Sequence, residues 1–439
     1  MTTKPLLTQI RPTYFSVDCG MAYLIRLENG KFIMIDSTYG EYDEVDHIYS
    51  LLCEQNETDS LPCIEAWIFT HPHDDHTGGF IRMARDYAKK LTVQNVIYNF
   101  PQDLCERTHD HGDFLTAIST FNSEVIIPKR GDRLSFGGAE FNVIFTADDC
   151  SIRPVNVNET SLTMRMTLGN YSVMWLGDIQ PVGSKIVMQN HSRDDLKCDI
   201  VQVGHHGYMG ASDEFYRAID PSIALWPVPE SRYYEMLADP WNRFFTDPEN
   251  HLRHIFCGGI EEITIDMTAP IEVTNPYVKT KKVADFTKES IYALDWACIT
   301  GGGMGYGSAQ LTFGDDNCTL SAGERPTLIK MVQKGQAAAS DKLEFSIELE
   351  ADSDCEAIGI IYDCADPTKP DTYEYFPIPH KVGESLALSL KTDRAAGNAE
   401  ILVNESTTIL PLRTTEPCDI ILFMKNATVT VTKQEFENL

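Results

Sequence analysis

The residues best suited to chemistry lie in one short segment, positions 70–79, with the sequence THPHDDHTGG. Three of the chain's twelve histidines and two carboxylates fall within six consecutive positions. An apolar run, residues 64–69, directly precedes the segment and predicts a buried strand. Imidazole and carboxylate are the usual protein ligands of Zn²⁺ and other first-row metals. The spacing H-x-H-x-D-H therefore predicts a centre that can hold two metal ions.

The positions of these side chains divide them between two ions. His71 and His73 are two residues apart, so in an extended segment they point the same way and can reach one metal. Asp75 and His76 are adjacent and diverge, which suits a second metal close by, at the turn into a helix. The alternative is a solvated, His- and Asp-rich surface loop, which the preceding strand and the following glycines disfavour.

Two later strands also end in groups that bind metals. Asp178 follows the apolar run 171–176, where a carboxylate can bridge two cations; the alternative is an ordinary strand-end Asp. His205 and His206 follow the apolar run 198–203. One of the two is expected to bind metal and the other to contact substrate or donate a proton. We assign His205 as the ligand, because it is nearer the strand end, and His206 as the catalytic group.

The elements that must position these residues are strands, hairpins and helices, mixed up to about residue 270. Asn29-Gly30 between two apolar runs predicts a type I′ hairpin, and Gly169-Asn170 separates two further runs. Apolar residues recur at helical spacing over 80–91, after the motif. Strand ends gather at one rim of a sheet, where α/β proteins hold their sites. We therefore expect an α/β (α+β) domain with the candidate residues at one rim.

The pattern changes toward the C-terminus. From residue 291 onward the sequence shows short alternating strands separated by turn residues, which predict a β-sandwich. We divide the chain into a catalytic domain at 1–275, a linker at 276–290, and a smaller C-terminal β-sandwich domain of unknown role at 291–439.

Composition limits the partners. The net charge of −29 disfavours nucleic acid and anionic membranes, so a small-molecule substrate is the expected partner. No apolar run is long enough to span a bilayer, and the N-terminus lacks the apolar core of a signal peptide. The twelve cysteines form no C-x-x-C pair, which favours reduced thiols and a cytoplasmic location. The sequence does not indicate an oligomeric state.

The order of the motifs resembles the metallo-β-lactamase superfamily over residues 11–270. The resemblance rests on the H-x-H-x-D-H motif, on Gly177-Asp178 and on the Gly-His-His-Gly segment at 204–207. Together with the segment 158–162, Asn-Glu-Thr-Ser-Leu, these motifs are similar to the branch of ComEC-type and phosphorylcholine-esterase-type domains. The resemblance implies a four-layer αβ/βα sandwich with a mono- or dinuclear metal site at one edge.

The resemblance also implies a role for each ligand. His71 and His73 would bind the first metal, Asp75 and His76 the second, and Asp178 would bridge the two. His205 or His206 would complete the second site. Two divalent ions are implied, with Zn²⁺ the first choice and Mn or Fe as alternatives.

This chain departs from the family pattern at two places. The family often has Asp-x-Gly where this chain has Asp36-Ser37-Thr38. Many members supply a third histidine to the first metal, but no histidine lies between His111 and Asp178 here. Asn158 occupies that neighbourhood, so the first metal site is expected to be more open.

We therefore expect a metal-dependent hydrolase that uses a metal-activated hydroxide, most simply on a small phosphoester or phosphodiester. Asp75 would orient the nucleophile and His206 would assist the leaving group. One alternative is hydrolysis of an acyl bond, in a lactam, lactone or thioester, at the same site. Another is a non-catalytic binding protein with a vestigial metal site.

Four residues are candidates for substrate binding. Asn158 lies where the missing ligand would fall. His109 and His111 lie in a loop that mimics the metal motif and could reach the same rim, the alternative being a solvated loop. Arg232 belongs to a possible specificity insertion at 226–256, where it could supply a cation near the metals.

Overall fold

The computed structural model describes most of the chain, namely residues 3–12, 19–40, 44–58, 60–101, 111–150, 156–237, 239–247, 249–260, 262–272, 281–283, 286, 296–299, 309–314, 316–332, 334–337, 340–352, 355–364 and 375–439. Contacts within the chain divide it into two compact units between residues 273 and 274. Each unit is built around its own apolar core.

The first unit contains two sheets of seven strands each. Sheet A has the order β14-β1-β2-β3-β4-β5-β6; its strands are antiparallel from β14 to β3 and parallel from β3 to β6. The strands of sheet A are β1 (Leu6–Gln9), β2 (Ala22–Arg26), β3 (Phe32–Asp36), β4 (Cys63–Ile68), β5 (Thr92–Ile97), β6 (Glu124–Ile126) and β14 (Ile263–Asp266).

Sheet B repeats this plan with the order β13-β12-β11-β10-β9-β8-β7. It is parallel from β13 to β10 and antiparallel from β10 to β7. The strands of sheet B are β7 (Arg133–Phe136), β8 (Ala139–Phe145), β9 (Thr163–Leu168), β10 (Tyr171–Trp175), β11 (Ile200–Gln202), β12 (Ile223–Trp226) and β13 (His254–Cys257). In each sheet the parallel half is built from strand–helix crossovers, and the antiparallel half includes hairpins such as β2–β3 and β9–β10.

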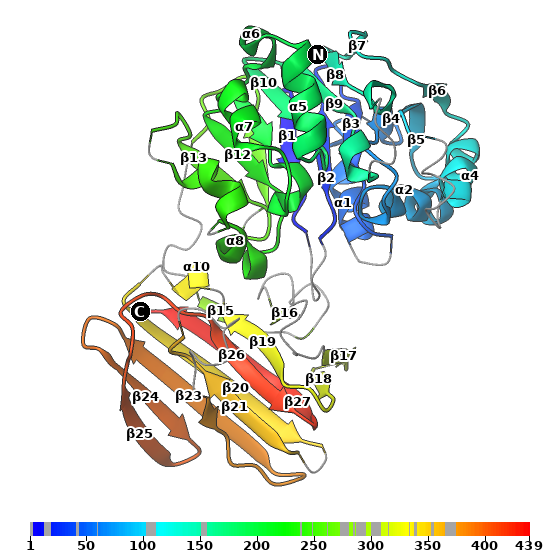
Figure 1. The fold of residues 1–439 in the computed structure, drawn as a ribbon. Coiled ribbons are helices and arrows are strands. Elements are labelled where there is room, and N and C mark those ends of the chain that lie inside the picture. The colour runs from blue at the N-terminus through cyan, green and yellow to red at the C-terminus, as the bar shows by residue number, and fades with distance from the viewer. Residues whose placement is uncertain are drawn as a thin grey trace. The chain divides into compact units, whose positions relative to one another are not determined.

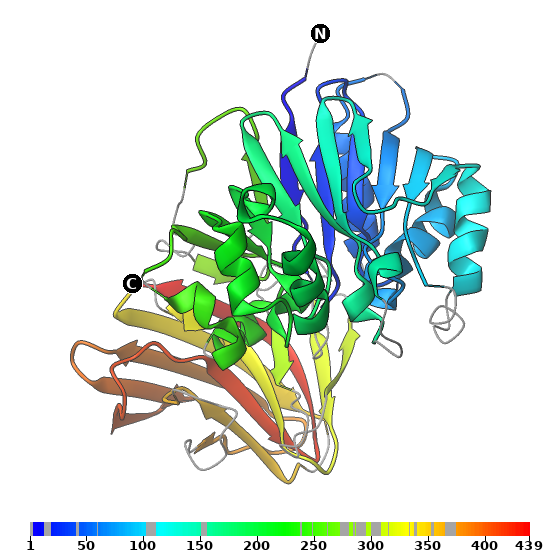
Figure 2. The ribbon, with the colours of Figure 1, turned by 45° about the horizontal axis from the view of Figure 1, so that its top comes forward.

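Helices cover the outer faces of the two sheets (Figures 1 and 2). Those that follow the strands of sheet A are α1 (Glu44–Gln55), α2 (Asp74–Tyr87) and α4 (His111–Phe121). Those of the sheet B half are α5 (Pro181–Asn190), α6 (Arg193–Leu196), α7 (Asp213–Ile219) and α8 (Glu230–Leu237), with the 3₁₀ turns η1 (Ala147–Asp149), η2 (Asn158–Thr160), η3 (Gly204–Gly207) and η4 (Pro240–Thr246).

Alternate residues of the strands supply two separate apolar layers. One face of sheet A packs against α1, α2 and α4 through side chains such as Trp67 and Phe80. Its other face joins sheet B in a second core that includes Tyr23 and Trp175, whose ring centroids lie 4.9 Å apart. The unit is therefore a four-layer αβ/βα sandwich, as predicted from the resemblance.

The second unit is an all-antiparallel β-sandwich, which confirms the predicted class. One sheet has the order β17-β18-β27-β20-β23-β24-β25, and β15 also pairs with β27. Its strands are β15 (Lys281–Val283), β17 (Ala309–Phe313), β18 (Cys318–Ala322), β20 (Lys342–Ala351), β23 (Ser385–Asp393), β24 (Asn398–Val403), β25 (Ser406–Pro411) and β27 (Ala427–Asn438).

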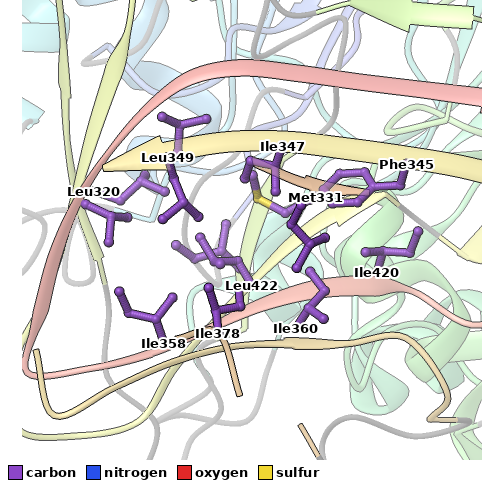
Figure 3. Close-up of a cluster of buried hydrophobic side chains, with 14 of the residues drawn as sticks. Leu320, Met331, Phe345, Ile347, Leu349, Ile358, Ile360, Ile378, Ile420 and Leu422 are labelled. Atoms are coloured by element: carbon purple, nitrogen blue, oxygen red, sulfur yellow. The ribbon is translucent and has the colours of Figure 1, made fainter. Parts of the chain in front are cut away.

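The other sheet has the order β16-β19-β26-β21-β22. Its strands are β16 (Ala297–Ile299), β19 (Thr327–Val332), β21 (Ala357–Ile361), β22 (Phe376–Pro377) and β26 (Ile420–Lys425), and a short helix, α10 (Lys334–Ala337), follows β19. Alternate residues of β20 are buried, among them Phe345 and Ile347, and they meet Ile360 and Leu422 of the facing sheet in one core (Figure 3).

Two local features can be compared with the sequence. The expected hairpin joins β2 to β3, but its turn is not the predicted type I′. Type I′ requires positive φ at both central residues, whereas only Gly30 (φ +78°) and not Asn29 has positive φ, and the Gly30 N–H donates to Leu27 O. The range expected to be a linker, 276–290, contributes three of its residues to the second unit as β15, which pairs with the C-terminal half of β27.

Candidate metal centre

Four strands bring the candidate residues to one rim of the first unit. In sheet A, β3 ends at Asp36 and β4 leads through the 69–73 loop into α2. In sheet B, β10 is followed by Asp178 and β11 by the Gly204–Gly207 turn. The ligands therefore come from both sheets, as expected from strand ends that carry polar groups.

The H-x-H-x-D-H motif lies across the start of α2. His73 is the residue before the helix, with extended backbone (φ −79°, ψ 154°), and Asp74 and Asp75 fall in the first turn. Carboxylates are favourable there because the free N–H groups of a helix N-terminus carry partial positive charge. His71 and His73 meet side by side, with Nε2 of His71 3.0 Å from Nδ1 of His73.

Within the described residues, the side chains form two sets whose ligand atoms lie within 4.8 Å of one another. One set is Asp75, His76, Asp178 and His206; the other is His71, His73 and Asp75. Asp75 belongs to both. The structure thus brings together all the predicted metal residues except His205, and adds His206.

Asp178 lies at the centre of the two sets. Its Oδ2 is 3.3 Å from His76 Nε2, 3.6 Å from His206 Nε2 and 3.7 Å from His71 Nε2. Its Oδ1 is buried and has no hydrogen-bond partner among the described residues. This carboxylate faces histidines of both sets, which is the position required of a bridging ligand.

The chemistry of the donors fits divalent cations. Nε2 of His206 faces Nε2 of His76 at 3.3 Å, and His71 faces His73 in the same way. Nδ1 of His76 faces the Asp36 carboxylate and Nδ1 of His206 faces Pro227 O, so each neutral ring holds its proton on Nδ1 and turns a lone pair at Nε2 toward the other ring. A cation between the two Nε2 atoms accepts both lone pairs. Buried imidazole and carboxylate donors in these numbers match a site for zinc or a related first-row metal.

The backbone directs His206, rather than the predicted His205, into the ligand sets. Both residues have positive φ, +51° and +52°, so the chain turns left-handed and distance from the strand end does not decide which ring points inward. His206 is 2% exposed; its Nδ1 contacts Pro227 O at 3.0 Å and its Nε2 is 3.3 Å from Asp75 Oδ2. His205 Nε2 stays 3.9 Å from Asp178, and its ring contacts Asn158 and Gln180.

Gly207 holds this turn in place. Its φ is +85°, and a Cβ at this position would lie 2.3 Å from the indole of Trp226, whose Nε1 donates to His206 O. We expect Gly207→Ala to lower the free energy of unfolding by about 2–4 kcal/mol, from left-handed backbone strain and overpacking. Denaturant unfolding of the metal-free protein measures this. Gly112→Ala, with open space around its Cβ, is the matched control; equal stability of the two variants would contradict the assignment.

Asp36 is a site residue that sequence reasoning did not assign. It is fully buried, and its carboxylate accepts hydrogen bonds from Thr70 N (2.8 Å) and Thr70 Oγ1 (2.7 Å). It also lies 2.8 Å from Nδ1 of His76. A carboxylate on Nδ1 leaves Nε2 of the same ring as the metal-facing atom. The sequence feature that could have identified Asp36 is its place at the end of β3, directly after the apolar residues 32–35.

Burial and the neighbouring charges set the pKa values in the centre. Burial lowers the pKa of His71 well below its usual value and also lowers that of His73, which keeps both rings neutral. Burial also acts to lower the pKa of His76, but Asp178, Asp75 and Asp36 outweigh it and raise that pKa well above its usual value. Burial opposes ionisation of Asp178, yet the histidines around it hold its pKa well below the usual range.

His206 has a raised pKa as well, because the Cys19 thiol, Asp178 and Asp75 together outweigh its burial. The raised pKa values favour the protonated form of His76 and His206 in the metal-free protein, so metal binding competes with protons at these rings. We expect zinc binding at pH 7 to release protons and zinc affinity to fall as the pH is lowered. Calorimetry in buffers of different ionisation enthalpy counts the protons; an enthalpy independent of the buffer would contradict this.

The remaining candidates lie outside the two ligand sets. Asn158 is 8% exposed and borders the centre through His205. His111 is the first residue of α4, where its ring stacks on Phe114. Arg232 lies on α8, and its backbone N–H donates to Pro229 O. His109 lies outside the described residues.

The layered architecture, the H-x-H-x-D-H loop and the ligand sets at the rim define a protein with the metallo-β-lactamase fold. The chain is similar to ComE operon protein 3 of Bacillus subtilis (strain 168), with 27% identity over 176 residues. The alignment covers 39% of this chain, and the chain spans only 21% of that protein. This similarity agrees with the ComEC-type branch. No protein-family model matches the chain.

Three solved structures are similar to the first unit. The metallo-β-lactamase fold protein YhfI from Bacillus subtilis has a TM-score of 0.40 and 12% identity, over 60% of this chain and 99% of that one. Zn²⁺-bound PqqB from Methylobacterium extorquens has a TM-score of 0.39 and 8% identity, over 60% and 99%. The diiron β-hydroxylase CmlA from Streptomyces venezuelae has a TM-score of 0.38 and 13% identity, over 61% and 55%.

Of the helices in the described part of the chain, none combines the length and the apolar character that crossing a membrane requires.

Proposed function

We propose that the first unit is a metal-dependent hydrolase that acts on a phosphoester or phosphodiester of modest size. The observation that carries the proposal is the convergence of His71, His76 and His206 on one oxygen of Asp178, next to Asp75 and His73. The metal is proposed to be zinc, with manganese or iron as alternatives. The cytoplasmic location remains a prediction from sequence.

The chain's own residues would hold and orient the reacting groups. When bound, two divalent ions lower the pKa of a water to roughly 7 and stabilise charge on the substrate. His71 and His73 would hold one ion, His76 and His206 the other, with Asp75 and Asp178 shared between them. Asp75 also remains positioned to orient the nucleophile, since it contributes to both ligand sets. His206 replaces His205 as the proposed ligand and is no longer available as a proton donor.

The choice of phosphoesters rests on the resemblance to the ComEC-type and phosphorylcholine-esterase-type branch. The net charge of −29 favours a small substrate over a long polyanion. A lactam, lactone or thioester is the alternative substrate class at the same site. A binding protein with a vestigial site is disfavoured, because six buried or half-buried donors remain in ligand geometry.

Turnover of bis(p-nitrophenyl) phosphate by purified protein loaded with zinc or manganese tests the proposal. We expect hydrolysis that chelation abolishes and that His73→Ala reduces by on the order of 10²-fold or more. His251→Ala, at an exposed histidine paired with Asp220, is the control and should retain activity. Turnover of p-nitrophenyl butyrate but not of the phosphodiester would favour the acyl-bond alternative. Failure to bind metal after reconstitution would leave only the binding protein.

A further inference from the structure

Gln202 is a buried side chain that links the two turns of sheet B from which metal ligands come. It is the last residue of β11 and is fully buried. Its Oε1 accepts from the N–H groups of Leu176 and Gly177, each at 2.8 Å. Its Nε2 donates to Gly177 O at 3.0 Å and to Val203 O at 2.7 Å. All of these hydrogen bonds go to the backbone.

The partners of Gln202 fix the orientation of its amide. Two backbone N–H groups face one end of the amide, so that end must be the oxygen. Two carbonyl oxygens face the other end, which must be the NH₂ group. Reversing the amide would place donors against donors and acceptors against acceptors at every contact. The side chain is therefore held in a single orientation.

Gln202 lies where the ladder between two neighbouring strands stops. β10 and β11 pair in parallel as far as Met174 and Val201. One residue further on β10 ends, and the chain turns at Gly177, which has φ +53°. Buried backbone N–H and C=O groups need partners, and the Gln202 amide bonds to both groups of Gly177. The side chain thus allows the two strands to diverge toward the ligands without leaving these groups unpaired.

The carbonyl of Gly177 joins the two ligand turns directly. It accepts from Gln202 Nε2 and also from the N–H of His205, at 3.0 Å. Asp178 follows Gly177 in the chain, and His206 follows His205. A shift of this one carbonyl would therefore move the backbone that carries both ligands.

We propose that Gln202 positions Asp178 and His206 as one unit, and thereby sets the affinity of the ligand set that contains them for its metal ion. The inference rests on the proposed function, whose metal centre it assumes, and deepens it by naming a residue that controls the occupancy of that centre. Gln202 acts through the backbone, so it is a positioning residue. Ligands that are already ordered before the metal arrives lose less conformational freedom when they bind it.

Zinc binding to the full-length protein tests the proposal without turnover. Gln202→Met keeps the length of an unbranched side chain but removes its hydrogen bonds to the two turns. We expect this variant to bind one zinc ion about 10- to 100-fold more weakly than the wild type, the usual effect of losing a group that orients a ligand. With Co²⁺ in place of zinc, the visible absorption bands should shift, because they report ligand geometry. Unchanged zinc affinity with an unchanged Co²⁺ spectrum would overturn the proposal.

The matched control loosens a link between the same two strands at their other ends. Asp199 Oδ2 accepts from Ser172 N and from Ser172 Oγ, each at 2.7 Å. Ser172→Ala should lower stability but leave zinc affinity and the Co²⁺ spectrum unchanged, because Asp178 lies beyond the opposite end of β10. Equal weakening of zinc binding in Ser172→Ala and Gln202→Met would indicate a general loosening of the strands, and would overturn the positioning role.

The effect should fall mainly on one of the two ions. In a His73→Ala background, Gln202→Met should weaken the remaining zinc ion by the same 10- to 100-fold or about that, since His206 still holds it. In a His206→Ala background the loss should be smaller, because only Asp178 then transmits the change. Equal losses in the two backgrounds would show that Gln202 does not act through the turn that carries His206.

Gln202→Glu separates the two halves of the amide. Its carboxylate can still accept from Leu176 and Gly177, but it sets an oxygen against the carbonyls of Gly177 and Val203, so zinc affinity should stay low. Wild-type affinity in this variant would overturn the link between the turns. Hydrogen exchange of the wild type provides a test that does not depend on the folding of a variant. The N–H groups of Leu176 and Gly177 should exchange slowly without zinc, and rapid exchange would overturn the proposal.

These readouts separate the inference from the proposed function. A protein that binds zinc in a manner dependent on Gln202, but hydrolyses no phosphoester, would support the positioning role and contradict the proposed function. A protein that hydrolyses the phosphodiester, and keeps its full zinc affinity and rate in Gln202→Met, would support the proposed function and overturn the role of Gln202.

Discussion

Asp178→Asn is expected to reduce hydrolysis by on the order of 10³-fold or more while the protein stays folded. Asp178 Oδ2 faces histidines of both ligand sets at 3.3–3.7 Å, so the substitution removes one of the two negative charges, those of Asp75 and Asp178, that the two ions would share. A metal centre contributes several kcal/mol to the stabilisation of a transition state, and each 1.4 kcal/mol lost is about tenfold in rate.

Metal content distinguishes this explanation from a general loss of structure. We expect Asp178→Asn to retain fewer than two equivalents of zinc after dialysis and to keep the circular dichroism spectrum of the wild type. Asp74→Asn is the matched control, since Asp74 lies in the same motif but is exposed. Full activity in Asp178→Asn, or the same loss in Asp74→Asn, would rule out the bridging role.

Asp36→Ala is expected to have the largest effect on stability and to weaken zinc binding at the same time. Its carboxylate accepts from Thr70 N and Thr70 Oγ1 and orients His76 through Nδ1. Removing it leaves the Thr70 N–H and the His76 ring without these partners in a fully buried position. Loss of one partner from a buried ionic pair costs about 3–5 kcal/mol, and loss of a group that orients a ligand weakens metal binding about 10- to 100-fold.

The two effects can be separated by chelation. Unfolding by denaturant in excess EDTA reports the loss of stability without metal, and zinc titration of the folded variant reports the affinity. Asp36→Asn should recover much of the stability, because its oxygen can still accept from Thr70 N, but less of the zinc affinity. Wild-type zinc affinity in Asp36→Ala would show that His76 does not depend on this contact.

Local sequence was sufficient for most of the centre. The extended backbone at His73 and the start of α2 at Asp74 follow from short-range rules: an apolar strand that leads into the motif, and carboxylates in the first turn of a helix. The same rules place Asp178 after β10. The resemblance to the metallo-β-lactamase superfamily implied the αβ/βα sandwich, and alternating strands with turn residues predicted the β-sandwich.

Non-local contacts decided the parts that sequence did not predict. Parallel pairing of β3 with β4 brings Asp36 beside the H-x-H-x-D-H loop, and sequence spacing alone does not reveal that pairing. The orientation of His206 depends on two left-handed histidines and on a glycine packed against Trp226, residues outside the metal motif itself. The contact between Asn158 and His205 spans 47 positions in the chain.

The origin of the ligands in both sheets has a consequence for how the protein matures. His76 and His206 are 130 residues apart in the chain, yet their rings meet in the centre. A nascent chain that has been synthesised only through β6 carries the H-x-H-x-D-H motif but neither Asp178 nor His206, so it can offer only a partial set of ligands. Long-range closure of this kind is slow compared with local folding. High-affinity metal capture would therefore mark the end of folding of the first unit, and incompletely folded chains would remain inactive.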